Sequence, residues 1–223
     1  MTSPDLLPLD TPTTPARRLV VMDVDSTFIT AEVIELLAEH AGTRAEVAAI
    51  TEAAMRGELD FAASLHARVA TLAGLPTSVL DEVRAAVQVS PGAEELITFL
   101  AERDWPLALV SGGFIEIVGP LARSYGITRA RANALEVDDG GRLTGRVTGP
   151  VIDRAAKAAA LREYAAAEGI DLADTVAIGD GANDLDMIAA AGTGIAYNAK
   201  PVVAAQADHA VTGSLTGVVD LLR

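Results

Sequence analysis

The chain has 223 residues, 50% of them hydrophobic and 22% charged, a composition typical of a globular protein with a substantial core. It contains no cysteine, which excludes disulfides, thiolate nucleophiles and cysteine-ligated metal sites. The formal net charge of −14 argues against binding to nucleic acid or to anionic membranes as the main role. No apolar run approaches the roughly 18 residues that span a bilayer, and the N-terminus lacks signal-peptide features. We therefore expect a cytoplasmic protein.

The N-terminal segment differs in composition from the rest of the chain. Four prolines fall within the first fifteen residues, together with threonine and aspartate, so we expect residues 1–16 to form a mobile tail. The first predicted element is the apolar run 19–22, which is typical of a strand buried on both faces of a parallel sheet.

Strand and helix patterns alternate along most of the chain, which indicates a doubly wound α/β sheet. The further predicted strands are 106–110, 175–178 and 194–197, and the predicted helices are 93–101, 115–124, 154–168 and 184–191.

Two stretches depart from this alternation. Residues 31–87 show helical periodicity only, broken into short helices by Gly42, Gly57 and the Gly74–Pro76 turn. We predict a helical insert there, positioned as a cap over the edge of the sheet. Residues 135–147 contain Asp-Asp-Gly-Gly between two short strand-like runs and predict a hairpin.

Acidic residues follow two of the predicted strands. Asp23 and Asp25 come after the first strand, and Asp180 and Asp184 after the strand at 175–178, with glycine on both sides of Asp180. In open α/β sheets ligands bind outside the carboxyl ends of the strands, where both clusters fall. Gathered carboxylates repel one another unless a cation holds them, and oxygen ligands suit a hard ion such as Mg²⁺. Single acids at such positions often only cap helices, but two clusters favour a metal site.

A third strand end has the features of an anion site. The sequence after Val110 is Ser111-Gly112-Gly113, whose small residues let backbone amides approach a ligand at the start of a helix. Lys157 lies early in a predicted helix and is suited to hold phosphate as a point cation if it faces the same crevice. Each feature is also compatible with an ordinary turn or a solvated surface charge.

Together these motifs resemble a known family. Asp-x-Asp-Ser-Thr, Ser-Gly-Gly, a lysine and Gly-Asp-Gly-Ala-Asn-Asp, in this order, are similar to the motifs of the haloacid dehalogenase-like hydrolases, and within them of the phosphoserine phosphatase branch. The match runs from about Leu19 to the C-terminus. It implies a Rossmann-like core, residues 17–30 and 88–223, with a helical cap, residues 31–87.

The resemblance also implies roles for the core residues. Asp23 would be the nucleophile and Asp25 the general acid and base. Mg²⁺ would be held by the side chains of Asp23 and Asp180 and by the backbone carbonyl of Asp25. The phosphoryl group would be bound by Ser111, the Gly112 amide and Lys157, with Asn183 as a further site residue and Asp184 in support.

The substrate implied by the resemblance is phosphoserine, converted to serine and phosphate in the last step of serine biosynthesis. Glu32 would face the substrate ammonium group and Arg68 its carboxylate, while Met55 and Phe61 would close over the site. Two alternatives remain: a phosphatase or phosphotransferase for another small ester, such as phosphohomoserine or a sugar phosphate, and an inactive relative that only binds a metabolite. The sequence is compatible with a monomer or a homodimer.

Overall fold

The computed structural model describes residues 17–55 and 58–223, and within these residues seven strands form a single sheet. The strand order is β4-β3-β2-β1-β5-β6-β7, and all neighbours are parallel except β3 and β4. The strands are β1 (Leu19–Met22), β2 (Leu107–Phe114), β3 (Arg129–Val137), β4 (Leu143–Thr148), β5 (Thr175–Gly179), β6 (Thr193–Tyr197) and β7 (His209–Val211).

The first strand lies at the centre of the sheet, between β2 and β5. All four of its residues are buried, and their side chains alternate between the two faces. Val20 and Met22 belong to one hydrophobic cluster, whereas Leu19 and Val21 belong to another. The continuous apolar run is therefore explained by burial on both sides, as a central parallel strand requires.

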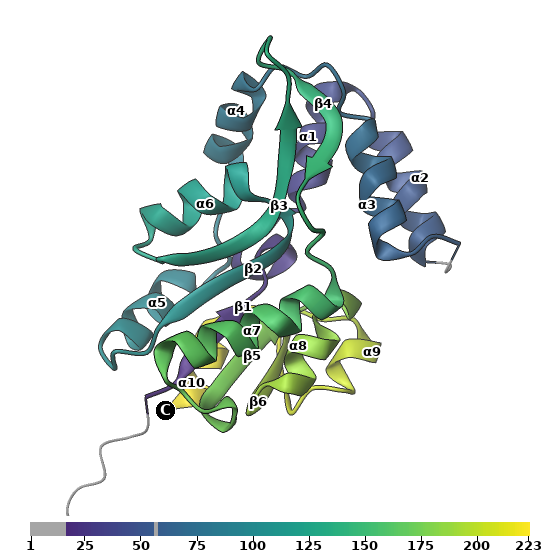
Figure 1. The fold of residues 1–223 in the computed structure, drawn as a ribbon. Helices are drawn as coiled ribbons and strands as arrows, with labels where there is room; N and C mark the ends of the chain where they lie inside the picture. The colour runs from purple at the N-terminus through teal and green to yellow at the C-terminus, as the bar shows by residue number, and fades with distance from the viewer. Residues whose placement is uncertain (1–16, 56–57) are drawn as a thin grey trace, which may run out of the picture.

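Helices cover both faces of the sheet (Figure 1). Helices α5 (Ala93–Ala101), α6 (Ile115–Ser124) and α10 (Thr216–Leu222) contribute to the cluster that contains Val20. Helices α7 (Arg154–Glu168), α8 (Leu185–Ala190) and α9 (Pro201–Ala204) contribute to the cluster that contains Leu19. The part of the core that the structure describes also contains three short helical turns: η1 (Val24–Phe28), η2 (Leu172–Asp174) and η3 (Ala182–Asp184).

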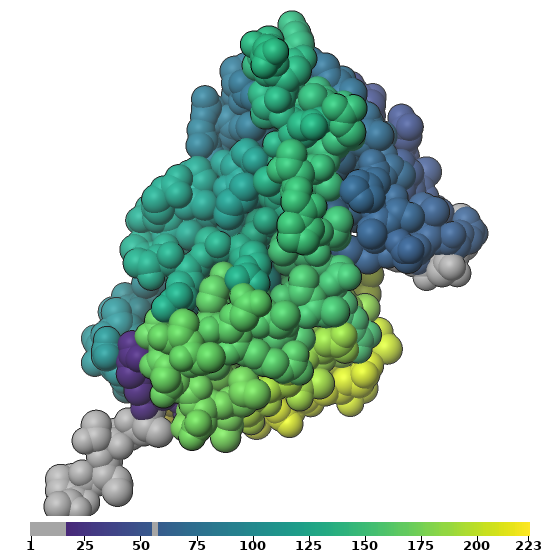
Figure 2. Space-filling view, in the orientation of Figure 1, coloured from purple at the N-terminus to yellow at the C-terminus, as the bar shows by residue number. Residues whose placement is uncertain are grey.

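Among the described residues between β1 and α5, four α-helices form the helical insert predicted from the sequence. The segments that lead into and out of the insert lie side by side, because Thr30 N donates to Gln88 O (3.0 Å) and Ser90 N to Phe28 O (2.8 Å). In the space-filling view the blue α2–α3 part overhangs the green and yellow core, with a recess beneath it (Figure 2). The insert helices are α1 (Val33–Ala41), α2 (Arg44–Met55), α3 (Phe61–Ala70) and α4 (Ser78–Ala86).

The hairpin of β3 and β4 supports the insert from the core side. Gly74 N donates to Leu143 O and Leu143 N to Leu75 O, both at 2.8 Å. Gly145 in β4 has a φ of +80°, and a Cβ there would lie 3.1 Å from the carbonyl oxygen of Ala70 in α3. Glycine at this position therefore allows the insert and the hairpin to pack at close range.

The α/β fold class is confirmed, and so are the predicted hairpin and the four predicted parallel strands. Two boundaries differ from the predictions by more than one residue. β2 continues through Ser111 to Phe114, where the sequence predicts a turn, and β3 begins at Arg129, before the predicted hairpin. The strand β7 and the helix α10 were not predicted. The expectation for residues 1–16 lies outside the described residues.

No helix in the described part of the chain is both long enough and apolar enough to cross a membrane.

Candidate active site

Asp23 and Asp180 leave the same edge of the sheet, because they follow the adjacent parallel strands β1 and β5. Met22 pairs with Ile178, and Asp23 N extends the ladder by donating to Ile178 O (2.9 Å). Oxygen atoms of Asp23, Asp180 and Asp184 all lie within 4.8 Å of one another. The two acidic clusters seen in the sequence therefore form one group.

Lys157 lies inside this group and is completely buried. Its Nζ donates to Asp23 Oδ1 (2.6 Å) and to Asp184 Oδ1 (2.7 Å). Burial disfavours the charged amine, but the carboxylates of Asp184 and Asp23 outweigh this effect and hold the pKa of Lys157 above its ordinary value. Asp153 places this lysine, since its side chain caps α7 by accepting from Ala156 N (2.9 Å), one turn before Lys157.

Asp184 uses both carboxylate oxygens within the protein. Oδ1 accepts from Lys157, and Oδ2 accepts from Gly181 N (3.0 Å). Gly179 is required for this arrangement, because a Cβ there would lie 2.5 Å from Asp184 Oδ2. Asp184 therefore holds Lys157 in place, and its carboxylate is fully buried in doing so.

The acids at this edge carry more negative charge than the lysine balances. Burial and the charge of Asp184 raise the pKa of Asp23 well above its ordinary value, against the opposing effect of Lys157. Burial and Asp184 also raise the pKa of Asp180 to about 6. A bound divalent cation would offset this repulsion, and carboxylate oxygens are suitable ligands for a hard ion. The donor set therefore fits a metal site.

Asp25 lies beside the group, in the turn η1 that follows β1. Its Oδ2 accepts from Ser111 Oγ and its Oδ1 from Val33 N, both at 2.9 Å. Burial raises the pKa of Asp25, although these hydrogen bonds oppose the shift. A Cβ at Gly113 would lie 2.5 Å from Asp25 Oδ2, so glycine at this position allows β2 to approach this acid.

Glu32 and Arg68, two of the predicted substrate-binding residues of the insert, lie near this turn. Ser26 has a φ of 55° and donates from Oγ to Glu32 Oε1 (2.7 Å). Burial and the charge of Asp25 raise the pKa of Glu32 to about 7. Burial lowers the pKa of Arg68, while the nearby charges of Glu32 and Asp25 oppose this. Glu32 and Arg68 are thus close enough to interact electrostatically, and both are partly exposed.

The remaining predicted residues have different positions. Phe61 lies against Gly112, since its ring Cζ is 3.0 Å from the place that a Cβ would occupy there. Asn183 lies in η3 with its side chain over Gly181. Met55 ends α2, and its side chain lies outside the described residues.

Two residues that the sequence did not single out also contact the site. Thr27 is completely buried and donates from Oγ1 to Asp180 Oδ1 (3.0 Å), so it joins the turn after β1 to the second acidic cluster. Its position in the Asp-x-Asp-Ser-Thr motif is the sequence feature that could have indicated this contact. Asn133 in β3 binds the backbone of Gly112, and its sequence context gives no signal of this contact.

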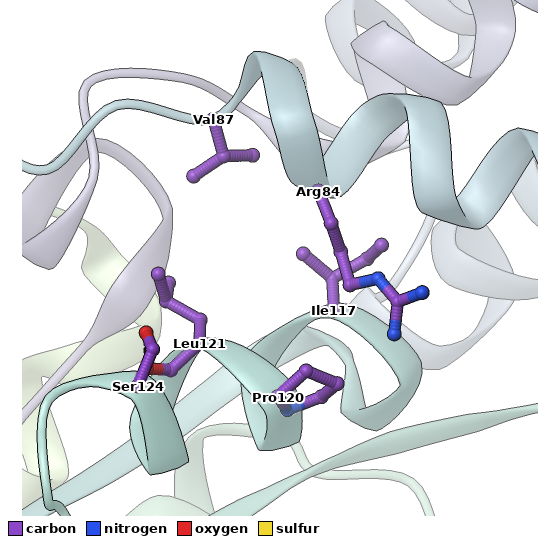
Figure 3. Close-up of a pocket in the computed structure, with 6 residues that line it drawn as sticks. All are labelled: Arg84, Val87, Ile117, Pro120, Leu121 and Ser124. Carbon is purple, nitrogen blue, oxygen red and sulfur yellow. Dashed lines mark hydrogen bonds between the residues drawn. The ribbon is translucent and has the colours of Figure 1, made fainter.

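A separate cavity of about 160 Å³ lies between α4 and α6 (Figure 3). Its lining is mainly apolar and contains none of the predicted site residues, so we assign it no part in the chemistry. The lining residues are Arg84, Val87, Ile117, Pro120, Leu121 and Ser124.

Comparison with known proteins shows the family of this chain. Residues 20–189 match the family described as haloacid dehalogenase-like hydrolase. The chain belongs to this family. Among haloacid dehalogenase-like hydrolases, the phosphoserine phosphatase of Streptomyces coelicolor is 61% identical over 88% of this chain. The phosphoserine phosphatase of Streptococcus thermophilus is 51% identical over 92% of this chain and 95% of its own length.

Not all relatives have the same length. The chain spans 48% of the Streptomyces coelicolor protein and 48% of the phosphoserine phosphatase SerB2 of Mycobacterium tuberculosis, to which it is 54% identical. Two solved structures of this hydrolase family match 93% of the chain with a TM-score of 0.87. One is a phospho-aspartyl intermediate analogue of phosphoserine phosphatase, 40% identical, and the other is a substrate-bound phosphoserine phosphatase, 39% identical.

Proposed function

We propose that this chain hydrolyses O-phospho-L-serine to L-serine and phosphate, with Asp23 as the nucleophile. The observation that carries the proposal is the buried pairing of Asp23 with Lys157 beside Asp180 at the carboxyl edge of the sheet. The names of the relatives support the substrate, in particular the Streptococcus thermophilus phosphatase that the chain matches over almost its whole length. The reaction is the last step of serine biosynthesis, in the cytoplasm.

In the first step a carboxylate oxygen of Asp23 attacks phosphorus, and the bond from phosphorus to the serine oxygen breaks. Asp25 gives its proton to the departing serine oxygen. Burial supports this role, because it raises the pKa of Asp25 and so favours the protonated acid at the start of the reaction. The hydrogen bonds from Ser111 and Val33 fix the direction in which the carboxyl group points.

In the second step Asp25, now a carboxylate, removes a proton from a water molecule whose oxygen attacks the phosphorus. The bond between phosphorus and Asp23 breaks, which releases phosphate and restores both acids. Ser111, the Gly112 amide, Lys157 and Asn183 bind the phosphoryl oxygens in this proposal. Lys157 would share its charge between Asp23 and the phosphoryl group, since Asp184 already fixes its position.

The metal of the proposed reaction is Mg²⁺, held by the side chains of Asp23 and Asp180 and by the backbone carbonyl of Asp25. Bound there, it would neutralise the acidic group and bind a phosphoryl oxygen. Thr27 would orient Asp180 through its hydrogen bond to Oδ1. The excess of buried carboxylates over the single lysine supports this assignment.

Selectivity is proposed to come from the insert, acting as a cap of residues 31–87 on a core of residues 17–30 and 88–223. Glu32 would accept the substrate ammonium group, and Arg68 would bind its carboxylate. Phe61, and Met55 by position in the sequence, would cover the site. A zwitterionic amino acid needs charges of both signs, whereas a sugar phosphate needs neither.

The test is phosphate release from phosphoserine, phosphohomoserine, phosphothreonine and glucose 6-phosphate, each measured with and without Mg²⁺. We expect phosphoserine to give by far the highest kcat/KM, and only when Mg²⁺ is present. Comparable rates with glucose 6-phosphate would overturn the substrate assignment. Binding of phosphoserine without turnover would instead favour an inactive metabolite-binding relative.

A further inference from the structure

The pairing of β2 with β3 is irregular at the end of β2 that carries the proposed phosphate-binding groups. From Val110 to Phe114 β2 advances four residues, while β3 advances two, from Arg131 to Asn133. The segment 111–113 therefore bulges away from the regular ladder, and its backbone groups need partners other than those of β3. Ser111 Oγ accepts from Gly113 N (2.7 Å), which provides one of them.

Asn133 provides a hydrogen-bond partner for another backbone group of this segment. Its side chain is 2% exposed, and its Nδ2 donates to the carbonyl oxygen of Gly112 (2.8 Å). The same side chain accepts at Oδ1 from Ile152 N, also at 2.8 Å. Ile152 immediately precedes Asp153, the residue that caps α7 and so places the turn that carries Lys157.

One buried amide thus joins two segments that are distant in the sequence and both carry proposed phosphate-binding groups. We propose that Asn133 is a positioning residue, which fixes the Gly112 backbone relative to the start of α7 and hence relative to Lys157. The inference rests on the proposed function, because it concerns the groups that would bind the transferring phosphoryl.

The chemistry of the two contacts explains why an amide is required. The carbonyl of Gly112 needs a donor and the amide of Ile152 needs an acceptor, and asparagine offers both on one short side chain. Aspartate keeps the acceptor but, when ionised, faces the Gly112 carbonyl with a second acceptor. Leucine has a similar volume and removes both hydrogen bonds, which leaves the buried amide of Ile152 and the partly buried carbonyl of Gly112 without these partners.

The matched control is Thr175, at the N-terminal end of β5 and therefore away from the edge of the sheet that carries the site. It is 1% exposed and also joins two backbone segments, donating from Oγ1 to Leu172 O (2.7 Å) and accepting from Gly192 N (3.2 Å). Thr175→Val therefore removes two partly buried hydrogen bonds of a buried side chain without touching the proposed phosphate-binding segments. It reports what a purely structural loss does to turnover.

The first measurement is amide hydrogen exchange of full-length wild type, Asn133→Leu, Asn133→Asp and Thr175→Val. Asn133→Leu should speed exchange in residues 111–114 and at Ile152, and Asn133→Asp only in residues 111–114. Thr175→Val should leave both segments as in wild type. Unchanged exchange at both segments in Asn133→Leu would overturn the inference, and this readout does not depend on any activity.

The second measurement is turnover of phosphoserine, corrected for the folded fraction of each variant. Misplaced catalytic groups cost up to about 100-fold in rate, so we expect kcat of Asn133→Leu and Asn133→Asp to fall by about 10- to 100-fold. KM should change much less, and Thr175→Val should keep the wild-type kcat. Wild-type kcat in Asn133→Leu, with an active wild-type enzyme, would overturn the positioning role alone. An inactive wild type would contradict the proposed function, while the exchange experiment still decides the role of Asn133.

Discussion

The core half and the insert half of the proposed site hold their charges in different ways. In the core, Lys157 lies at 2.6 and 2.7 Å from two buried carboxylates, Asp23 directly after β1 and Asp184 in the η3 turn. In the insert, Glu32 bonds to Ser26 only six residues away, and Arg68 to the carbonyl of Ser64 in its own helix. Both of these charged side chains are partly exposed.

The difference separates chemistry from selectivity. Removal of Lys157 leaves two buried carboxylates without the cation that they share, so it should damage both folding and catalysis. Removal of a charged side chain of the insert breaks only a local, partly exposed contact, so it should lower the free energy of unfolding little. It should mainly change which substrates bind. Four substitutions test this contrast, from the core outwards.

The largest effect is expected for Asp23→Asn. The amide keeps the shape of the side chain but cannot act as a nucleophile, so kcat should fall on the order of 10⁴-fold or more, as for other enzymes that lose a nucleophile. The variant should still fold, because Lys157 keeps Asp184 as a partner. Circular dichroism and phosphate release check both statements. Residual turnover within tenfold of wild type would refute Asp23 as nucleophile.

Lys157→Met should cost both activity and stability. It leaves the carboxylates of Asp23 and Asp184 buried together, and breaking a buried ion pair in this way costs about 3–5 kcal/mol. Arg154→Met is the control on the same helix, since Arg154 pairs with Asp186 at the surface. Exposed pairs contribute at most about 1 kcal/mol. Equal destabilisation of the two variants in urea would contradict the distinction between buried and exposed charge.

A smaller and more selective change is expected for Arg68→Met. Loss of a charged partner for the substrate carboxylate should raise KM for phosphoserine by about 10- to 100-fold, the value of one to two charge-assisted hydrogen bonds. Turnover of a phosphate ester without a carboxylate should be unaffected. Arg44→Met, which removes an exposed arginine paired with Glu39 on the insert, is the control and should leave both substrates unchanged.

The smallest effect concerns pH. The pKa of Glu32 is raised from 4.5 to about 7, so the folded protein binds this proton more tightly than the unfolded chain does. Without Mg²⁺, the protonated Glu32 contributes fully to the free energy of unfolding below about pH 4.5, and this contribution is lost as the pH rises to about 7. Glu32→Gln should flatten the slope in this window by less than about 1 kcal/mol per pH unit, because solvent screens a partly exposed carboxyl. Urea titrations between pH 5 and 7 measure it, and an unchanged slope would contradict the burial of this carboxyl.

The features that could be predicted from the sequence are local. A run of apolar residues followed at once by acids, as at β1 and β5, indicates both a buried strand and a ligand-binding edge, and parallel pairing then brings Asp23 and Asp180 together. The position of the insert followed from the change of periodicity after β1. These conclusions needed only neighbouring residues and the rules of sheet topology.

The features that could not be predicted depend on contacts distant in the sequence. Asn133 binds Gly112 and Ile152, 21 and 19 residues away, at the point where the pairing of β2 and β3 is irregular. The short strand β7 has two exposed residues out of three and no periodicity, and exists through its pairing with β6. The backbone of Ser26, with a φ of 55°, adopts a conformation unusual for serine that its sequence does not reveal.

The central claim is that Asp23 carries the phosphoryl group, and acid quenching of the enzyme during turnover of phosphoserine tests it most directly. Low pH slows the hydrolysis of an acyl phosphate, so peptide mass spectrometry can locate the added phosphoryl group. We predict one phosphoryl group on the peptide that contains Asp23, present with Mg²⁺ and absent in Asp23→Asn. A phosphoryl group at another residue, or none during measurable turnover, would contradict the account.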